Sequence, residues 1–193
     1  MLASVPAKDP RADEVLRFWF RGAERRKEWF VKDPAFDAEI RARFLSIHEE
    51  AASGALEHWK EQPGSCLALV IALDQFPRNM FRGTARAFAT DAPAREAAAH
   101  ALAQGWDRAM RPVERLFLYL PFEHSESAAD QQRSLALMRE LARHPETADA
   151  LEWAEKHHAV IARFGRFPHR NAALGRPSTP AEIEFLRQPG SSF

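Results

Sequence analysis

The chain has 193 residues, of which 46% are apolar and 28% charged, and these proportions are typical of a globular protein rather than a disordered one. Its 27 Lys and Arg residues balance its 27 Asp and Glu residues, so the net charge of zero gives no general attraction to nucleic acid or to anionic membranes. We therefore expect a single domain over residues 1–193 that folds without disulfides or metal ions, and we expect no nucleic-acid or membrane partner.

The number of cysteines and the N-terminal residues indicate in which cellular compartment the protein is expected. The single cysteine, Cys66, precedes an apolar run and is expected to be a buried, inert thiol, which fits a reducing environment. Residues 1–10 include Lys8, Asp9 and two prolines but no apolar segment, so they do not indicate a signal peptide. The longest apolar run also falls far below the ~20 residues that a membrane helix needs. We expect a soluble, cytoplasmic protein.

Helix signals dominate the first half of the chain. Asp33-Pro34 is typical of an N-cap followed by proline at the first helical position, and apolar residues recur at helical spacing from 36 to 47 before Gly54. The apolar run 67–73 is compatible with a buried strand or a buried helix. We favour a helix because the chain offers no second strand to pair with it.

The second half predicts further helices, each with recognisable boundaries. We expect an alanine-rich helix capped by Asp91 and closed by Gly105, a short apolar helix over 114–120 stopped by Pro121, a helix over 127–143, one from about Thr147 to Phe164 before Gly165, and a last helix opened by a capping box at 179–182. The result is an all-α domain of about seven to nine antiparallel helices joined by short turns. No repeat of ~30 to 40 residues is evident, so the pattern alone does not indicate a regular solenoid.

Two polar segments have similar sequences. Asp-Gln-Phe-Pro-Arg-Asn at 74–79 and Arg-Phe-Pro-His-Arg-Asn at 166–171 each follow a helix, and each contains a proline that is expected to force the chain out of helical geometry. The chain has only two asparagines, Asn79 and Asn171, and both follow arginine within these segments.

Two interpretations of these segments are open. Arginine offers planar, bidentate donors for carboxylate or phosphate, and asparagine offers both donors and an acceptor, so the segments could line a pocket for an anion or a peptide backbone. The same residues could instead form a structural network that satisfies helix ends, for example through an Arg78–Asp74 pair. The candidate ligand-binding residues are Asp74, Gln75, Arg78, Asn79, Arg82, His124, His157, Arg163, Arg166, His169, Arg170, Asn171 and Arg176.

A third polar segment, Leu120–Glu126, follows the expected stop at Pro121. His124 and Glu126 could act as an acid–base pair, joined across the fold by His157 or His169. Alternatively, a serine at 125 or 127 caps the next helix, while Glu126 favours the positive end of that helix. Metal-ligand motifs, phosphate-binding loops and dinucleotide fingerprints are missing from the sequence, so we expect neither a metal nor a cofactor.

Several stretches resemble one bacterial family, the domain-of-unknown-function family numbered 924. They lie at 73–79, 120–126 and 163–171, with further matches at 15–20, 86–91 and 174–179. The resemblance spans nearly the whole chain and implies a right-handed α-α superhelix of the tetratricopeptide-like kind. It implies no activity, substrate or cofactor.

Three functions therefore compete. The first is a binding module in which Arg78, Arg166 and Arg170 hold a small anion or a peptide carboxylate. The second is a metal-independent hydrolase or lyase in which His124 is the acid–base group, oriented by Asp74 or Glu126. The third, by analogy of fold alone, is a protein–protein adaptor. We predict that the candidates Asp74, Arg78, Asn79, His124, Arg166, Arg170 and Asn171 meet in one place.

Overall fold

The computed structural model describes residues 7–21 and 25–191, and it contains helices and turns but no strand within those ranges. The α-helices are α1 (Pro10–Trp19), α2 (Pro34–Ala52), α3 (Pro63–Val70), α4 (Phe76–Met80), α5 (Asp91–Ala103), α6 (Pro112–Glu123), α7 (Ala128–Leu141), α8 (Ala150–Phe164) and α9 (Pro180–Leu186). A π-helical turn, η3 (Ile71–Gln75), joins α3 to α4, so these two form one continuous helix. The prediction of an all-α protein is confirmed.

Short 3-10 turns complete the architecture at the helix ends. They are η1 (Lys27–Trp29), η2 (Glu57–Glu61), η4 (Ala85–Ala87), η5 (Trp106–Ala109), η6 (Pro145–Thr147) and η7 (Pro168–Arg170). No helix among the described residues is both long and apolar enough to cross a membrane.

Local sequence signals explain most helix boundaries. The Asp33 carboxylate accepts hydrogen bonds from two N–H groups in the first turn of α2, and Ser127 caps α7 in the same way. Thr179 and Glu182 form the expected capping box at the start of α9. Gly165 ends α8 in the left-handed region, with φ of 69°, which glycine adopts without a steric penalty.

The predicted boundaries of α5, α6 and α8 are wrong. Pro121 lies inside α6, which continues to Glu123, because a proline this near a helix end removes only one intrahelical hydrogen bond and the surrounding residues are buried. Asp91 is the first residue of α5 rather than its cap, and the cap position belongs to Thr90. The helix expected from about Thr147 begins at Ala150, since the Thr147 hydroxyl donates to the carbonyl of Leu141 (2.8 Å) within a 3-10 turn.

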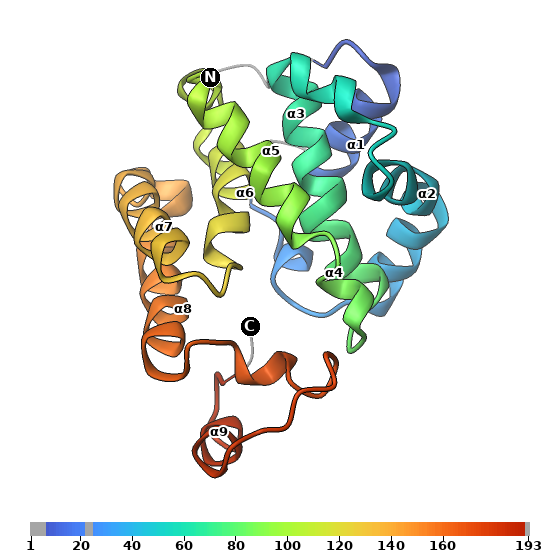
Figure 1. Ribbon diagram of the computed structural model, residues 1–193. Helices are drawn as coiled ribbons and strands as arrows, with labels where there is room; N and C mark the ends of the chain where they lie inside the picture. The colour runs from blue at the N-terminus through green and yellow to red at the C-terminus, as the bar shows by residue number, and fades with distance from the viewer. Residues whose placement is uncertain (1–6, 22–24, 192–193) are drawn as a thin grey trace.

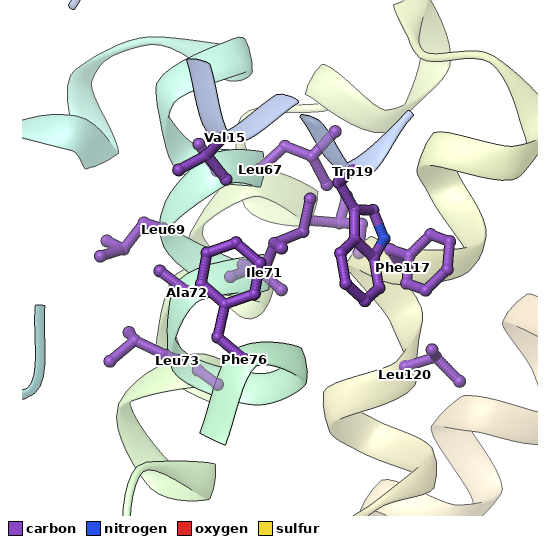
Figure 2. Packing of buried hydrophobic residues seen from close by; sticks show 14 of the residues in the cluster. Val15, Trp19, Leu67, Leu69, Ile71, Ala72, Leu73, Phe76, Phe117 and Leu120 are labelled. Atoms are coloured by element: carbon purple, nitrogen blue, oxygen red, sulfur yellow. The ribbon is translucent and has the colours of Figure 1, made fainter. Parts of the chain in front are cut away.

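The main core surrounds α3, which is buried on every side. In Figure 2, Trp19 of α1 packs beside Phe117 of α6, with ring centroids 5.3 Å apart in an edge-to-face arrangement, and Phe76 contacts the same indole at 5.8 Å. Each of these three side chains is fully buried. An α-helix that is apolar all round is expected at such a central position, which explains why the run 67–73 shows no amphipathic period.

The other helices pack around this core, with α1 and α5 against α3 and with α2 against α4. Figure 1 shows α1 and α2 on one side of the central α3, α5 and α6 on the other, and the α7–α8 hairpin outside α6. After α8 the chain turns back beneath α6 toward α4, carrying η7 and then α9 (Figure 1). This stacking of helix pairs fits the superhelix that the family resemblance implies. It also brings the π turn, the end of α6 and η7 to one side of the molecule.

Candidate functional site

The first polar segment remains helical around its proline. Pro77 is the second residue of α4, and the N–H of Phe76 donates to the carbonyl of Ile71 in the wider π pattern. Because Pro77 has no N–H to offer the carbonyl of Leu73, that carbonyl accepts from the hydroxyl of Thr90 instead. The expectation that this proline breaks the helix is therefore wrong, since a widened turn and one side-chain donor accommodate it.

The neighbouring carbonyls of the π turn also bind side chains. Nδ1 of His48 lies 2.9 Å from the carbonyl oxygen of Ala72, and the Arg78 guanidinium donates to the carbonyl of Asp74 (2.9 Å). π turns inside helices are frequent at functional sites. Here the turn places the side chain of Asp74 in the interior, where its exposure is 0%.

Asp74 and His124 form a close pair at the centre of the site. Nδ1 of His124 lies 2.9 and 3.0 Å from the two carboxylate oxygens of Asp74, and the Gln75 amide donates to the same carboxylate (2.6 Å). Burial by itself would raise the pKa of Asp74, but the charge of Arg78 and the contact with His124 lower it well below its usual range. The carboxylate is therefore ionised and can only accept hydrogen bonds.

The protonation of His124 follows from the same contacts. Burial lowers the pKa of His124, and the nearby Arg78 cation lowers it further, against the opposing effect of Asp74. The imidazole is thus neutral at pH 7. Since the Asp74 carboxylate can only accept, the single ring hydrogen is on Nδ1, which leaves the lone pair on Nε2. Among the described residues, no group hydrogen-bonds Nε2 of His124, and the side chain is 14% exposed.

One carboxylate, that of Asp91, connects the two similar polar segments, 74–79 and 166–171. Arg78 donates to both of its oxygens (2.7 and 3.1 Å), and Arg170 donates to one of them (3.2 Å). Arg78 also lies 3.2 Å from the carboxylate of Asp74, while Arg170 donates to the backbone carbonyl of His124 (2.9 Å). Asp91 therefore holds both guanidinium groups against the pair at the centre of the site.

Sequence reasoning missed Asp91 as a site residue because it read the aspartate only as a helix cap. The available signal was its place in the family-like stretch 86–91. In that stretch Phe88 also contributes to the site, since the Arg170 guanidinium lies over the Phe88 ring at 4.7 Å and over that of Phe167 at 4.5 Å.

A second buried acid and imidazole lie next to this centre. Nδ1 of His157 is 3.2 Å from a carboxylate oxygen of Glu123, and the ring of His157 lies 6.2 Å from that of His124 between centroids. Burial lowers the pKa of His157 to about 3 and that of His169 to about 4. Glu123, which sequence reasoning also missed, has a pKa raised to about 8, chiefly by burial.

Glu126 makes its contacts away from His124. Glu126 accepts both guanidinium nitrogens of Arg176 (2.8 and 3.0 Å) and the N–H of Phe167 (2.8 Å), so it anchors the segment after α8. The proposal that Glu126 simply favours the positive end of α7 is incomplete, because these partners come from more than 40 residues away. Asn171 accepts from Arg176 (3.0 Å) in the same network.

The remaining candidates lie in contacts of their own. Asn79 donates to the carbonyl of Gln75 (2.9 Å) and accepts from Arg82 (2.7 Å), which also binds Asp37 through two nitrogens. Arg166 makes a two-nitrogen contact with Glu182 (2.6 and 2.8 Å). Arg163 stacks on the rings of Phe164 and Phe185, away from the centre. Of the residues predicted to meet, Asp74, Arg78, His124 and Arg170 are in direct or Asp91-bridged contact, while Asn79, Arg166 and Asn171 belong to adjoining networks.

Two hollows on the described surface lie away from this site. One of about 410 Å³ is lined by residues around α1 and α2, among them Arg17, Arg21 and Arg43. Another, of about 230 Å³ between α8 and α9, is lined by Val160, Phe185 and other residues, and Arg163 is its only candidate residue. Within the ranges 7–21 and 25–191, no cluster of three or more His, Cys, Asp or Glu side chains could hold a metal ion.

Fold and site together define an all-α helical protein with a buried, internally paired Asp–His–Arg cluster between its central helix and the segment that follows α8. The chain belongs to the family described as bacterial protein of unknown function (DUF924), whose model matches residues 15–190. It is similar to the solved structure of the Agrobacterium tumefaciens protein of unknown function ATU0120, with 43% sequence identity and a TM-score of 0.85 over 92% of this chain and 97% of that one. No curated protein matches it.

Proposed function

We propose that the site performs acid–base catalysis, as a metal-independent hydrolase or lyase in which His124 is the general base. The observation that carries this proposal is the contact of His124 Nδ1 with both oxygens of the Asp74 carboxylate, at 2.9 and 3.0 Å. An ionised carboxylate in this position fixes the tautomer of the ring and stabilises the imidazolium that forms when Nε2 takes up a proton.

The charge balance of the site supports catalysis over simple anion binding. Arg78 faces Asp74 and Asp91, and Arg170 faces Asp91, so both cations are already paired within the protein. Arg166, Arg176 and Arg82 are paired with carboxylates in the same way. Fixed guanidinium groups beside a base stabilise negative charge that develops during a reaction, without requiring a bound anion in the ground state.

The state of the His124 ring is measurable without a substrate. ¹⁵N NMR of histidine-labelled protein at pH 7 is expected to give a protonated Nδ1 and an unprotonated Nε2 for His124. In Asp74→Asn, the neutral amide no longer stabilises the imidazolium, so the pKa of His124 should fall further. A hydrogen on Nε2 of His124 in the wild-type protein would exclude the proposed base.

Turnover tests the catalytic role directly. In a panel of esters, amides and β-substituted carboxylic acids, we expect His124→Gln to lose at least 100-fold in rate on any compound that the wild-type protein converts. His58→Gln is the matched control, because His58 is exposed and lies near Asp9, remote from the site. Equal rates for the wild type and His124→Gln would refute the assignment.

Binding of a small anion or a peptide carboxylate is a second candidate, favoured by one observation. Nε of Arg170 is buried and has no hydrogen-bond acceptor among the described residues, and such groups in native structures call for an explanation. Phosphate or acetate should then raise the melting temperature of the wild type but not of Arg170→Lys. An equal shift in both proteins would remove this candidate.

We also propose that the protein works in the cytoplasm. The support is the single thiol, which is buried and donates to the carbonyl of Ala97 (3.4 Å) rather than serving as half of a disulfide. Cell fractionation with antibody detection tests the location, and recovery from an oxidising compartment would refute it.

A further inference from the structure

Among the residues that the structure describes, Glu123 is a buried carboxyl group without a cationic partner. Its side chain is 4% exposed, and within the described ranges its only polar side-chain contact is Nδ1 of His157, 3.2 Å away. Glu126, three residues further on, differs from Glu123, because it is half-buried and its carboxylate is paired with Arg176. An ionised carboxylate in the position of Glu123 would have to bear the cost of burial without compensation by an opposite charge.

The groups around Glu123 come from the π turn, from α7, from α8 and from the residue just before α8. Asp74 approaches from the π turn, and His157 lies in α8. Asp149 stands just before α8, where it is paired with Arg25. α7 supplies the amide of Gln131, which donates to the backbone carbonyl of Glu123 (2.7 Å). Burial, followed by the negative charges of Asp74 and Asp149, raises the pKa of Glu123 to about 8, so the carboxyl group keeps its proton at neutral pH.

The orientation of His157 is fixed by its backbone contact. Nδ1 lies 2.9 Å from the carbonyl oxygen of Trp153, and a carbonyl can only accept, so Nδ1 carries the ring hydrogen. The same nitrogen lies 3.2 Å from a carboxylate oxygen of Glu123. The partial positive charge at this N–H therefore lies close to the carboxylate that remains after Glu123 has released a proton.

Glu123 and His124 are thus adjacent residues of one cluster whose pKa values are shifted in opposite directions. Asp74 is the common neighbour, since it binds His124 directly and its charge acts on Glu123. The ring of His157, which lies beside Glu123, is 6.2 Å from that of His124 between centroids. Pairs of ionisable groups whose environments separate their proton affinities in this way are typical of general acids and bases at work in one site.

We propose that Glu123 is the general acid that complements the base His124. The inference rests on the proposed acid–base function. In a hydrolysis, Nε2 of His124 takes a proton from water while the water oxygen bonds to the substrate atom that carries the leaving group. In an elimination, Nε2 takes the proton from the carbon next to the breaking bond, and the electron pair of that C–H bond forms a double bond. In both cases the bond to the leaving group breaks, and the Glu123 carboxyl group gives its proton to the departing group. His124 is then an imidazolium and Glu123 a carboxylate held by His157. Loss of a proton from His124 to solvent water and uptake of one by Glu123 restore the starting state, so no net proton is consumed.

The protonation of Glu123 is tested by ¹³C NMR of glutamate side-chain carboxyl carbons between pH 5 and 9.5, with Glu123→Gln to assign the signal. We expect a protonated carboxyl signal at pH 6.5 that titrates near pH 8, and a shift of the His124 ring nitrogens with the same midpoint. The Glu123→Gln variant should lose that shift. Glu126, assigned by Glu126→Gln, is the matched control and should show no titration in this range, because contact with Arg176 holds its pKa below the usual value despite partial burial.

The outcomes separate the two proposals. A Glu123 carboxyl group that is ionised throughout this range overturns the general acid, and so does a titration that leaves the His124 ring unaffected. Glu123 protonated as expected, together with a hydrogen on Nε2 of His124, would instead refute the proposed base. If a compound is found that the wild type converts, Glu123→Gln should lose most rate on substrates with strongly basic leaving groups and little on those that leave as stable anions.

Discussion

Replacement of Asp91 by asparagine perturbs the single group that joins both polar segments. The side chain keeps its shape but loses the charge that faces Arg78 at 2.7 Å and Arg170 at 3.2 Å. Arg78 retains Asp74 as a partner, whereas the buried Arg170 loses its carboxylate contact. The change therefore breaks about one buried ion pair, for which a loss of roughly 3–5 kcal/mol in the free energy of unfolding is expected.

Urea unfolding followed by circular dichroism measures this loss, and Glu140→Gln supplies the control. Glu140 pairs with Arg143 on the surface at a similar distance (2.9 Å), so its replacement should cost less than about 1 kcal/mol. A double variant that adds Arg170→Gln should recover part of the loss, because the uncompensated cation is removed as well. A cost for Asp91→Asn below about 1 kcal/mol, or no recovery in the double variant, would refute this account of the charge bridge.

Three further predictions concern the backbone and the thiol. Thr90→Val should reduce the free energy of unfolding by about 1–3 kcal/mol in urea, because the carbonyl of Leu73 that Pro77 leaves without a helical donor would lose its hydroxyl partner. Gly165→Ala should cost about 1–2 kcal/mol through backbone strain alone, since no heavy atom of the described residues beyond its two chain neighbours lies within 4 Å of the added methyl group. Ellman's reagent should not modify Cys66 in the native protein, because burial excludes the reagent and raises the pKa of the thiol to about 12.

The sequence indicates the site through polar segments near prolines, which differ from the usual capping residues at helix ends. The sequence predicts site residues among the polar side chains near prolines, and the structure brings Asp74, Arg78, His124 and Arg170 together. Nearness in sequence also suggests Glu126 as the partner of His124. In the folded chain, Glu126 is paired with Arg176. His124 instead contacts Asp74, which lies 50 residues before it in the sequence.

Local sequence patterns also fail to predict whether a helix continues through a proline. Pro77 and Pro121 both lie inside helices, where the sequence predicted that a helix would end. What a proline removes is one hydrogen bond, and whether the helix continues depends on whether another donor reaches the freed carbonyl. For Pro77 the donor is Thr90, which no local pattern around the proline could reveal.

The sequence by itself determined the all-α class, most helix boundaries and the family, because caps, glycine terminators and apolar spacing act within a few residues. Only the tertiary structure decided which charges meet. Asp91 serves both Arg78 and Arg170, and Glu123 meets no cation within the described residues, because partner choice depends on how distant helices pack. That pairing sets which carboxyl groups are ionised and which keep a proton. The chemistry proposed for the site is therefore a consequence of packing that the linear order of residues does not contain.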